Sequence, residues 1–234
     1  MDLVKSKWSS ADVKDFLDYL YGLSRGEEKA SWEKRIVNTN MKCLAVQSAD
    51  VANIVKEIKK GDSISFIDTF LPVWDNHTLI NILGKLICTI KDFDVFKKYL
   101  KVYAQKIDNW SSCDTLKFNI KGREKDYLQL SKEFQTSPYP FVRRIGLGIL
   151  FNQKVFVDEV FVALDRLQNE QEYYVNMMGA WCLQQCMVIA RDETIQYFKN
   201  NQTNKFIINK AISKCRDSFQ ISKEDKEYLL QFRK

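Results

Sequence analysis

Residues 76–107 read NHTLINILGKLICTIKDFDVFKKYLKVYAQKI. Apolar side chains recur there at helical spacing, which predicts two helices, Asn76–Ile90 and Phe93–Ile107, joined by only two residues. Comparable pairs are predicted later in the chain, over 140–152 with 155–168 and over 171–190 with 192–200. Such pairs recur at about 30–40 residues, the period of two-helix repeats of the HEAT or armadillo type. The sequence therefore predicts an all-α fold, an α-solenoid of HEAT-like two-helix repeats.

The rest of the chain fits the same pattern. Further helices are predicted from capping residues and periodicity, over 10–21, 27–37, 48–60, 63–71, 110–118, 123–135, 204–217 and 223–233. We expect residues 1–234 to form a single HEAT-like repeat domain, with residues 1–40 as its N-terminal helices. In a solenoid one helix of each pair lines a concave surface, so functional residues are expected on those inner helices.

The composition excludes several classes of protein and site. The 234 residues include 8 Gly, 3 Pro and one histidine, His77. Too few turn residues are present for a β-sandwich or barrel, and too few clustered glycines for a phosphate-binding loop. A single histidine excludes a paired-His zinc site. We expect no metal and no cofactor, and we place His77 at the surface or in a cap at the start of a helix. The six cysteines form no C-x-x-C pair and are expected to be buried, reduced thiols.

Positive charge is concentrated near the end of the sequence. The formal net charge is +6, and residues 198–234 hold nine basic and four acidic residues. A basic face on a helical protein is typical of phosphate binding. The sequence has no apolar run of about 18 residues and no secretory signal. We therefore expect a cytoplasmic, monomeric protein with a polyanionic partner and no membrane association.

The stretch DNWSSCD at 108–114 places Trp110 and Asp114 four residues apart, on one face of a helix. An indole face attracts a delocalised cation by roughly 0.5–2 kcal/mol, and a carboxylate stabilises a positive charge that develops nearby. With an arginine beside them to hold a phosphate, these groups suit alkylated DNA. An N3- or N7-alkylated purine is already a good leaving group, so a general acid is not needed.

Two later stretches carry the other candidate residues. FVRRIG at 141–146 opens an apolar helix with Arg143 and Arg144, which point in different directions because they are adjacent. At least one of them is therefore expected in a surface or structural ion pair. YYVNMMGAW at 173–181 places a stripe of large side chains on one helix face, formed by Tyr174, Met177, Met178 and Trp181. Close approach of helices is predicted at the small residues Gly146, Gly148 and Gly179.

The order of W-x-x-x-D, FVRRIG, YYVNMMGAW and NKAISKCRDSF resembles the AlkD-like family of DNA alkylation repair proteins, which are HEAT-repeat alkylpurine DNA glycosylases. The resemblance covers roughly residues 40–234. It implies a concave, basic face that receives duplex DNA containing alkylated bases. It also implies that Trp110 and Trp181 contact the lesion nucleotide and that Asp114 stabilises the deoxyribose cation and positions water. Arg144 corresponds to the motif arginine, or Arg143 if the register shifts by one.

Further candidate DNA contacts lie on the predicted helices near the end of the sequence. Lys210 and Lys214 lie four residues apart on one predicted helix, and with Arg216 and Tyr174 they are candidate DNA contacts. No lysine adjoins Asp114 as an imine-forming nucleophile, so a monofunctional hydrolytic glycosylase is expected. Trp181 also fits core packing. A non-catalytic repeat protein that binds DNA lesions or unusual DNA structures, and a protein-binding scaffold, are the alternative functions.

Overall fold

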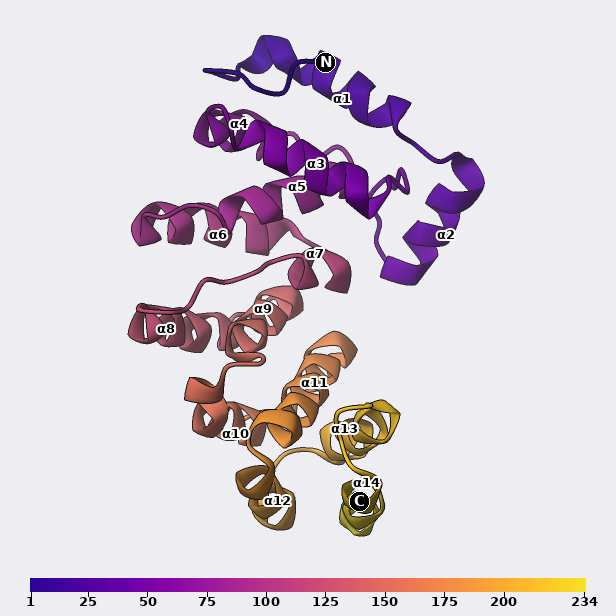
Figure 1. Ribbon diagram of the computed structural model, residues 1–234, viewed down its shortest axis with the longest axis vertical. Coiled ribbons are helices and arrows are strands. Elements are labelled where there is room, and N and C mark those ends of the chain that lie inside the picture. The colour runs from indigo at the N-terminus through magenta and orange to yellow at the C-terminus, as the bar shows by residue number, and fades with distance from the viewer. The chain divides into compact units, whose positions relative to one another are not determined.

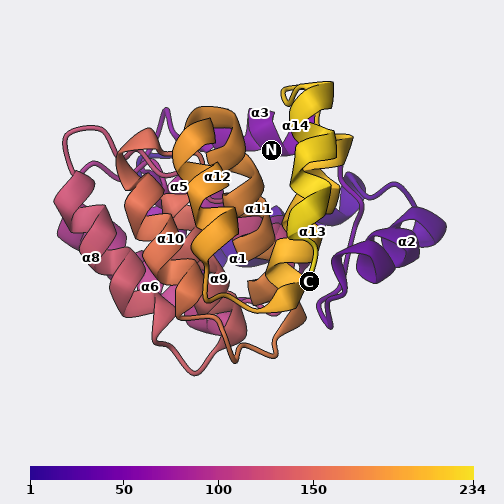
Figure 2. The same cartoon turned by 90° about the horizontal axis from the view of Figure 1, so that it is seen from below.

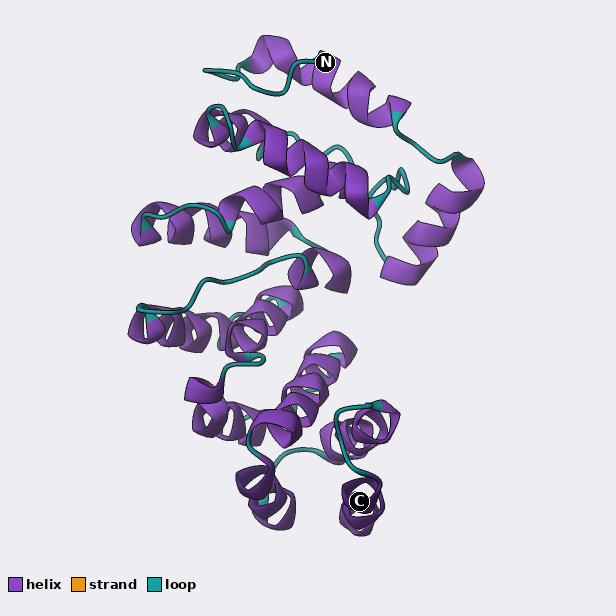
Figure 3. Cartoon of the chain, in the orientation of Figure 1, coloured by secondary structure: helices purple, strands orange, loops and turns teal.

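The computed structural model describes residues 1–234, and the chain consists of helices and loops throughout (Figure 3). It contains fourteen α-helices and three short 3-10 segments. No strand is present, and the one β-type contact is an isolated parallel bridge between Lys42 and Asn76. The all-α prediction is confirmed, and the helices follow one another through short connections as the repeats of an α-solenoid do. No helix is both long and apolar enough to span a bilayer.

The helices pack into two compact units, Met1–Asn119 and Ile120–Lys234. The first unit contains, as labelled in Figure 1, α1 (Val13–Gly22), α2 (Glu27–Val37), α3 (Ser48–Ile58), α4 (Ser63–Phe70), α5 (His77–Ile87), α6 (Phe93–Lys106) and α7 (Trp110–Asp114). The second contains α8 (Glu124–Gln135), α9 (Pro140–Leu150), α10 (Val157–Asp165), α11 (Tyr173–Ile189), α12 (Arg191–Asn200), α13 (Lys205–Asp217) and α14 (Lys223–Tyr228). A single repeat domain over the whole chain stays a prediction.

The N-terminal segment of the first unit is anchored by an aromatic cluster and a glycine. Trp8 is buried and meets Phe66 edge-on, with ring centroids 5.0 Å apart. Nearby, the Lys5 carbonyl oxygen accepts a hydrogen bond from Asp62 N at 2.7 Å. A Cβ on Gly61 would lie 2.2 Å from that oxygen. The glycine that follows α3 is therefore required by the close approach of two backbones.

α5 is the central helix of the first unit. It packs against α3, α4, α6 and α7, and nine of its eleven residues are buried. Asn76 caps it, because its side-chain oxygen accepts a hydrogen bond from Leu79 N at 2.9 Å. His77, the first residue, has only 2% of its surface exposed. The prediction of a surface position for His77 is therefore wrong, because neighbouring helices bury the whole first turn.

α7 ends before Phe118, the predicted end of this helix. Tyr103 on α6 donates its hydroxyl hydrogen to Ser112 O at 2.9 Å. If the α-helix continued, Leu116 N would donate to Ser112 O. Leu116 N donates instead to Cys113 O at 3.2 Å, which is the pattern of a 3-10 turn. Gly84 on α5 makes room for the tyrosine, since a Cβ at Gly84 would lie 2.7 Å from the hydroxyl oxygen.

α11 is the central helix of the second unit and packs against α9, α10, α12 and α13. Figure 2 shows α11 beside α13. Close approach is confirmed at two of the three predicted glycines. A Cβ on Gly146 would lie 2.9 Å from Gln135 N, and one on Gly179 would lie 3.1 Å from Ile207 Cδ1. At Gly148 a Cβ would make only an ordinary contact of 3.5 Å.

The cysteines also follow the prediction. All six are free thiols, and five of them are buried. Cys88 is partly exposed. The thiols therefore serve mainly as small apolar side chains in the cores of the two units.

Candidate active site

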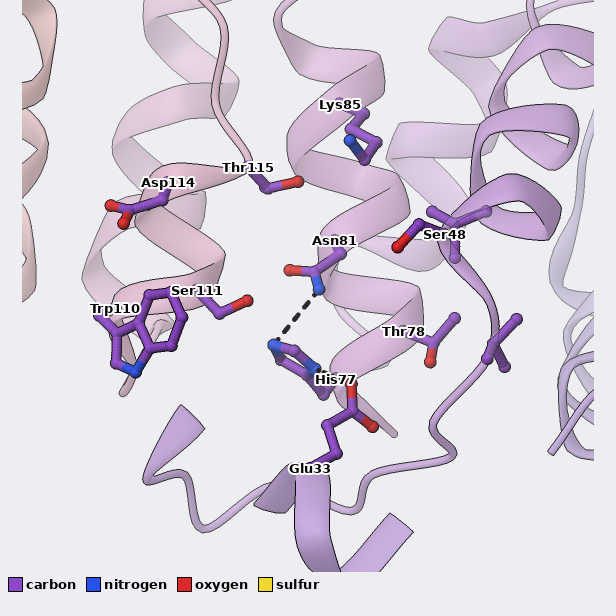
Figure 4. Close-up of a pocket in the computed structure, with 12 residues that line it drawn as sticks. Glu33, Ser48, His77, Thr78, Asn81, Lys85, Trp110, Ser111, Asp114 and Thr115 are labelled. Atoms are coloured by element: carbon purple, nitrogen blue, oxygen red, sulfur yellow. Dashed lines mark hydrogen bonds and ion pairs between the residues drawn. The ribbon is translucent and has the colours of Figure 1, made fainter. Parts of the chain in front are cut away.

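A cavity of about 320 Å³ lies among α2, α5, α7 and the start of α3 in the first unit (Figure 4). Trp110 and Asp114, predicted on one helix face, both line it. The other polar lining residues are Glu33, Ser48, His77, Thr78, Asn81, Lys85, Ser111 and Thr115. An aromatic ring and a carboxylate thus line the same cavity, as a site for a cationic group requires.

Buried polar side chains anchor α7 at its start. Asn109 is fully buried and caps the helix, because its side-chain oxygen accepts a hydrogen bond from Ser112 N at 2.9 Å. The preceding Asp108 accepts hydrogen bonds from the Thr39 hydroxyl at 2.5 Å and from Asn40 N at 2.8 Å. These bonds fix α7 to the segment that follows α2, and so they position the two cavity residues that α7 carries.

A chain of hydrogen bonds joins α7 to α2 through α5. The Ser112 hydroxyl donates to Asn81 Oδ1 at 3.3 Å. Asn81 Nδ2 in turn donates to His77 Nε2 at 3.3 Å (Figure 4). The His77 ring then carries its hydrogen on Nδ1, which donates to Glu33 Oε1 at 3.0 Å. Glu33 Oε2 accepts from Ala45 N at 2.8 Å. The one histidine of the chain is therefore a link between helices.

The cavity favours cations. Burial raises the pKa of Glu33, but hydrogen bonds from His77 and Ala45 outweigh burial and hold that pKa below its ordinary value of 4.5. Glu33 is therefore a carboxylate at neutral pH, and Asp114 brings a second carboxyl group to the same cavity. Lys85 is the one lysine or arginine among the lining residues. An electron-rich indole completes a lining that suits a positively charged, planar ligand.

In the second unit, aromatic and basic side chains lie together on α11 and α13. Trp181 is 38% exposed, and Lys214 Nζ lies 4.8 Å from its ring centroid. Two turns earlier on both helices, Tyr173 contacts Phe206 at 5.8 Å, and Lys210 Nζ lies 5.9 Å from the Phe206 ring. We call these five residues the α11/α13 strip. Trp181 is thus partly exposed rather than a core residue, although Phe151 packs against it at 5.6 Å.

Arg143 and Arg144 diverge, as expected for adjacent residues. Arg143 forms a two-point ion pair with Glu170, with Nε–Oε2 at 2.9 Å and Nη2–Oε1 at 3.0 Å. The prediction that one arginine serves a structural ion pair is confirmed for Arg143. Arg144 is 3% exposed and donates to Tyr174 O at 2.7 Å. Both side chains therefore hold the start of α11.

Of the two remaining predicted contacts, Tyr174 borders the α11/α13 strip, with its ring 5.2 Å from that of Tyr173, and Arg216 lies apart from it. Tyr174 is half-buried and packs on Phe141 at 5.6 Å, whereas its neighbour Tyr173 is exposed. Arg216 is exposed and faces α14, where it lines a cavity of about 330 Å³ with Lys226 and acidic residues. The structure therefore groups Lys210 and Lys214 with Trp181, and it does not group Arg216 with them.

Several site residues were missed by sequence reasoning. His77 and Asn81 are spaced four apart on α5, a pattern that marks a shared face, but nothing in the sequence indicates that this face meets α7. Glu33 lies in a charged helix and looks like an ordinary solvated residue. Tyr173 and Phe206 could have been found as large side chains in positions four residues before Met177 and Lys210.

Comparison with known proteins identifies the family. Residues 23–215 match the model of a family described as DNA alkylation repair enzyme. The match begins before residue 40, where the motif resemblance starts, so α2 and Glu33 lie inside the matched region. Comparison with curated proteins and with solved structures yields no match. Since the matched residues make up most of its length, the chain belongs to the DNA alkylation repair enzyme family.

Proposed function

We propose that this protein is a monofunctional DNA glycosylase that hydrolyses the N-glycosidic bond of cationic alkylated purines, of the 3-methyladenine and 7-methylguanine type, in duplex DNA. The observation that carries the proposal is that the Trp110 ring and the Asp114 carboxylate line one cavity. Membership of a DNA alkylation repair family supports DNA as the substrate. Glu33 in the same cavity further favours a cationic base over a neutral one.

The reaction proceeds by loss of the base as a neutral molecule. The bond between C1′ and the purine nitrogen breaks, and its electron pair neutralises the positive charge of the alkylated base. The sugar is left as an oxocarbenium ion, which the Asp114 carboxylate stabilises. Water then adds to C1′ and passes its proton to Asp114, which leaves an abasic deoxyribose. The indole of Trp110 stabilises the cationic nucleotide by roughly 0.5–2 kcal/mol.

The second unit supplies contacts to the DNA in this proposal. Lys210 and Lys214 neutralise phosphates, and Trp181 packs against the lesion nucleotide once Lys214 turns from its ring to a phosphate. Arg144 is assigned as the motif arginine, because Arg143 is already paired with Glu170 through two hydrogen bonds. Since Arg144 is buried and bonded to Tyr174 O, it acts on the bound DNA by holding the start of α11. Tyr174 and Arg216 are assigned weaker contacts at the edge of the bound duplex.

The direct test is release of methylated bases. The protein is incubated with methylated duplex DNA, and free bases are quantified by mass spectrometry over time. Asp114→Asn should lower the rate by roughly 100-fold or more, because it removes the charge that stabilises the oxocarbenium ion. Asp15→Asn, an exposed aspartate on α1, is the matched control and should leave the rate unchanged. Equal rates for the Asp114→Asn variant and the unaltered protein would overturn the assignment.

A non-catalytic role in binding DNA lesions or unusual DNA structures is the second candidate. The α11/α13 strip favours it, because aromatic faces and lysines bind nucleic acid without any reaction. This alternative predicts salt-dependent binding to methylated or distorted DNA with no base release. A protein-binding scaffold predicts neither binding nor release at near-physiological salt, so one pair of measurements separates the three functions.

A further inference from the structure

Three side chains that bind metals well meet beside the cavity of the first unit. They are Glu33 on α2, Cys43 in the loop before α3, and His77 at the start of α5. One carboxylate oxygen, the thiol sulfur and one ring nitrogen all lie within 4.8 Å of one another. Cys43 and His77 are buried and Glu33 is half-buried. We propose that Glu33, Cys43 and His77 form a Zn²⁺ site, contrary to the expectation of no metal from the sequence, in which these three residues are far apart.

The donor set favours zinc among the common cations. Thiolate and imidazole are ligands of zinc rather than of Mg²⁺ or Ca²⁺, and a carboxylate completes a mixed set of three. Zinc–ligand bonds of about 2.0–2.3 Å place tetrahedral donors roughly 3.3–3.7 Å apart. His77 Nδ1 and Glu33 Oε1 are already 3.0 Å apart. Small side-chain movements are therefore enough to bring all three donors to one ion.

The backbone holds the ligands in place. His77 N donates to Lys42 O at 2.8 Å, next to the isolated bridge between Lys42 and Asn76. This bond fixes the residue before Cys43 to the first residue of α5. Ala45 N, two residues after the cysteine, bonds to Glu33 and fixes the third ligand to the same loop. The three segments are thus positioned by contacts that do not depend on the ion.

The hydrogen bonds that neighbouring residues make to His77 and Glu33 are also compatible with a bound metal ion. Zinc on His77 Nδ1 would leave the hydrogen on Nε2, which faces the Asn81 amide at 3.3 Å. A turn of this amide presents Oδ1 to Nε2–H and Nδ2 to the Ser112 hydroxyl, so both bonds persist. Glu33 keeps its bond from Ala45 N. Each of these two ligands is therefore oriented from outside the site.

The charge balance is compatible with the cavity. The Cys43 thiol loses its proton to solvent on binding, so thiolate and carboxylate together neutralise the ion. A bound zinc then does not repel a cationic base next to Trp110, and in the zinc-bound state the attraction of such a base comes from Asp114 rather than from Glu33.

Cobalt substitution tests the proposal without DNA, so its outcome is independent of the proposed glycosylase activity. The full chain is treated with chelator, dialysed and titrated with Co²⁺ and then Zn²⁺. We expect one ion per chain, visible bands of a tetrahedral site, and a near-ultraviolet charge-transfer band from a thiolate. Cys43→Ser should abolish the charge-transfer band, and Cys88→Ser should keep it, because Cys88 lies outside the cluster.

Two further variants keep the test decisive if Cys43→Ser does not fold. Glu33→Gln leaves the thiolate in place and should weaken Zn²⁺ binding, measured by competition with a chromophoric chelator. Asn81→Ala should weaken it by about 10–100-fold, the usual effect of removing an outer hydrogen bond to a ligand. Absence of the thiolate band in the unaltered protein, or equal Zn²⁺ affinity in Glu33→Gln, would overturn the proposal.

Discussion

The indole nitrogen of Trp110 donates a hydrogen bond to the carbonyl oxygen of Ile36 at 3.2 Å. The bond joins α7 to the last turn of α2 and fixes the ring by its edge. The bond therefore restricts the orientation of a ring that lines the cavity together with Asp114. A tryptophan that is held in this way contributes orientation as well as an aromatic surface.

Trp110→Phe separates these two contributions. Phenylalanine retains an aromatic face but cannot donate to Ile36 O, so about 1 kcal/mol of positioning is lost. We expect base release to slow by roughly fivefold to tenfold. Trp110→Ala should slow it further, because the aromatic face is also lost. The measurement is single-turnover base release, and a Trp110→Ala rate equal to that of Trp110→Phe would contradict a role for the ring face.

Asn109→Ala removes the cap of the helix that carries both cavity residues. We expect the free energy of unfolding to fall by about 0.5–2 kcal/mol and base release to fall as well. Asp92→Ala is the matched control, because Asp92 caps α6 by accepting from Asp94 N and Val95 N. It should lower stability without slowing the reaction. Urea unfolding and base release are measured on both variants, and an equal loss of activity would refute a positioning role for Asn109.

Lys210→Ala and Lys214→Ala should weaken DNA binding and reduce its salt dependence. Each phosphate contact contributes about 0.9 to the slope of log affinity against log salt concentration. The slope, measured by fluorescence anisotropy, should therefore fall by about one per lysine. Lys14→Ala is the control, because Lys14 is exposed and paired with Asp18 on α1. Arg216→Ala tests whether a residue that faces α14 also contacts DNA.

Arg143→Ala should lower stability alone, whereas Arg144→Ala should lower both stability and DNA binding, because Arg144 is buried and bonded to Tyr174 O. The Arg143–Glu170 pair is mostly buried and has two hydrogen bonds, so its loss should cost about 2 kcal/mol of unfolding free energy. Glu170→Gln should reproduce most of that loss. DNA affinity is measured on all three variants under conditions in which they are folded. A weaker affinity for Arg143→Ala than for Arg144→Ala would reassign the motif arginine.

The ion pair between Arg191 and Asp225, which joins α12 to α14, makes stability depend on pH. Hydrogen bonds from the Arg191 guanidinium hold the pKa of Asp225 below its ordinary value of 3.8. Its stabilisation is therefore present above pH 3.8 and is lost as pH falls through the lower folded-state pKa. Urea unfolding at a series of pH values should show this loss in the unaltered protein. Asp225→Asn should lack that step.

Local signals predicted most of the helices. α2 begins at Glu27 and ends at Val37 as its charge pattern indicates, and α6 begins at Phe93 after the capping residue Asp92. The contacts at the end of α7 could not be predicted, because the Tyr103 hydroxyl that bonds Ser112 O comes from another helix. The same reason explains the error at His77, whose burial is produced by helices distant in sequence.

The candidate site was predictable where one helix carries the pattern. Trp110 and Asp114 share a face because they are four residues apart, and the structure places both in one cavity. Glu33 and His77 are 44 residues apart in sequence, and no local pattern relates them. The alignment of one helix against another cannot be predicted from local sequence either. Tyr173 and Phe206 are placed on the same surface as Trp181 only by the packing of α11 on α13.

The end of α7 is held from α6 because a methyl group is missing on α5. With glycine at position 84, the Tyr103 hydroxyl reaches Ser112 O, beside the turn that ends α7. A larger residue at position 84 would push the hydroxyl away from that carbonyl and loosen the attachment of α7 to α6. The position of the Asp114 carboxylate at the cavity thus depends on the smallest side chain of a neighbouring helix.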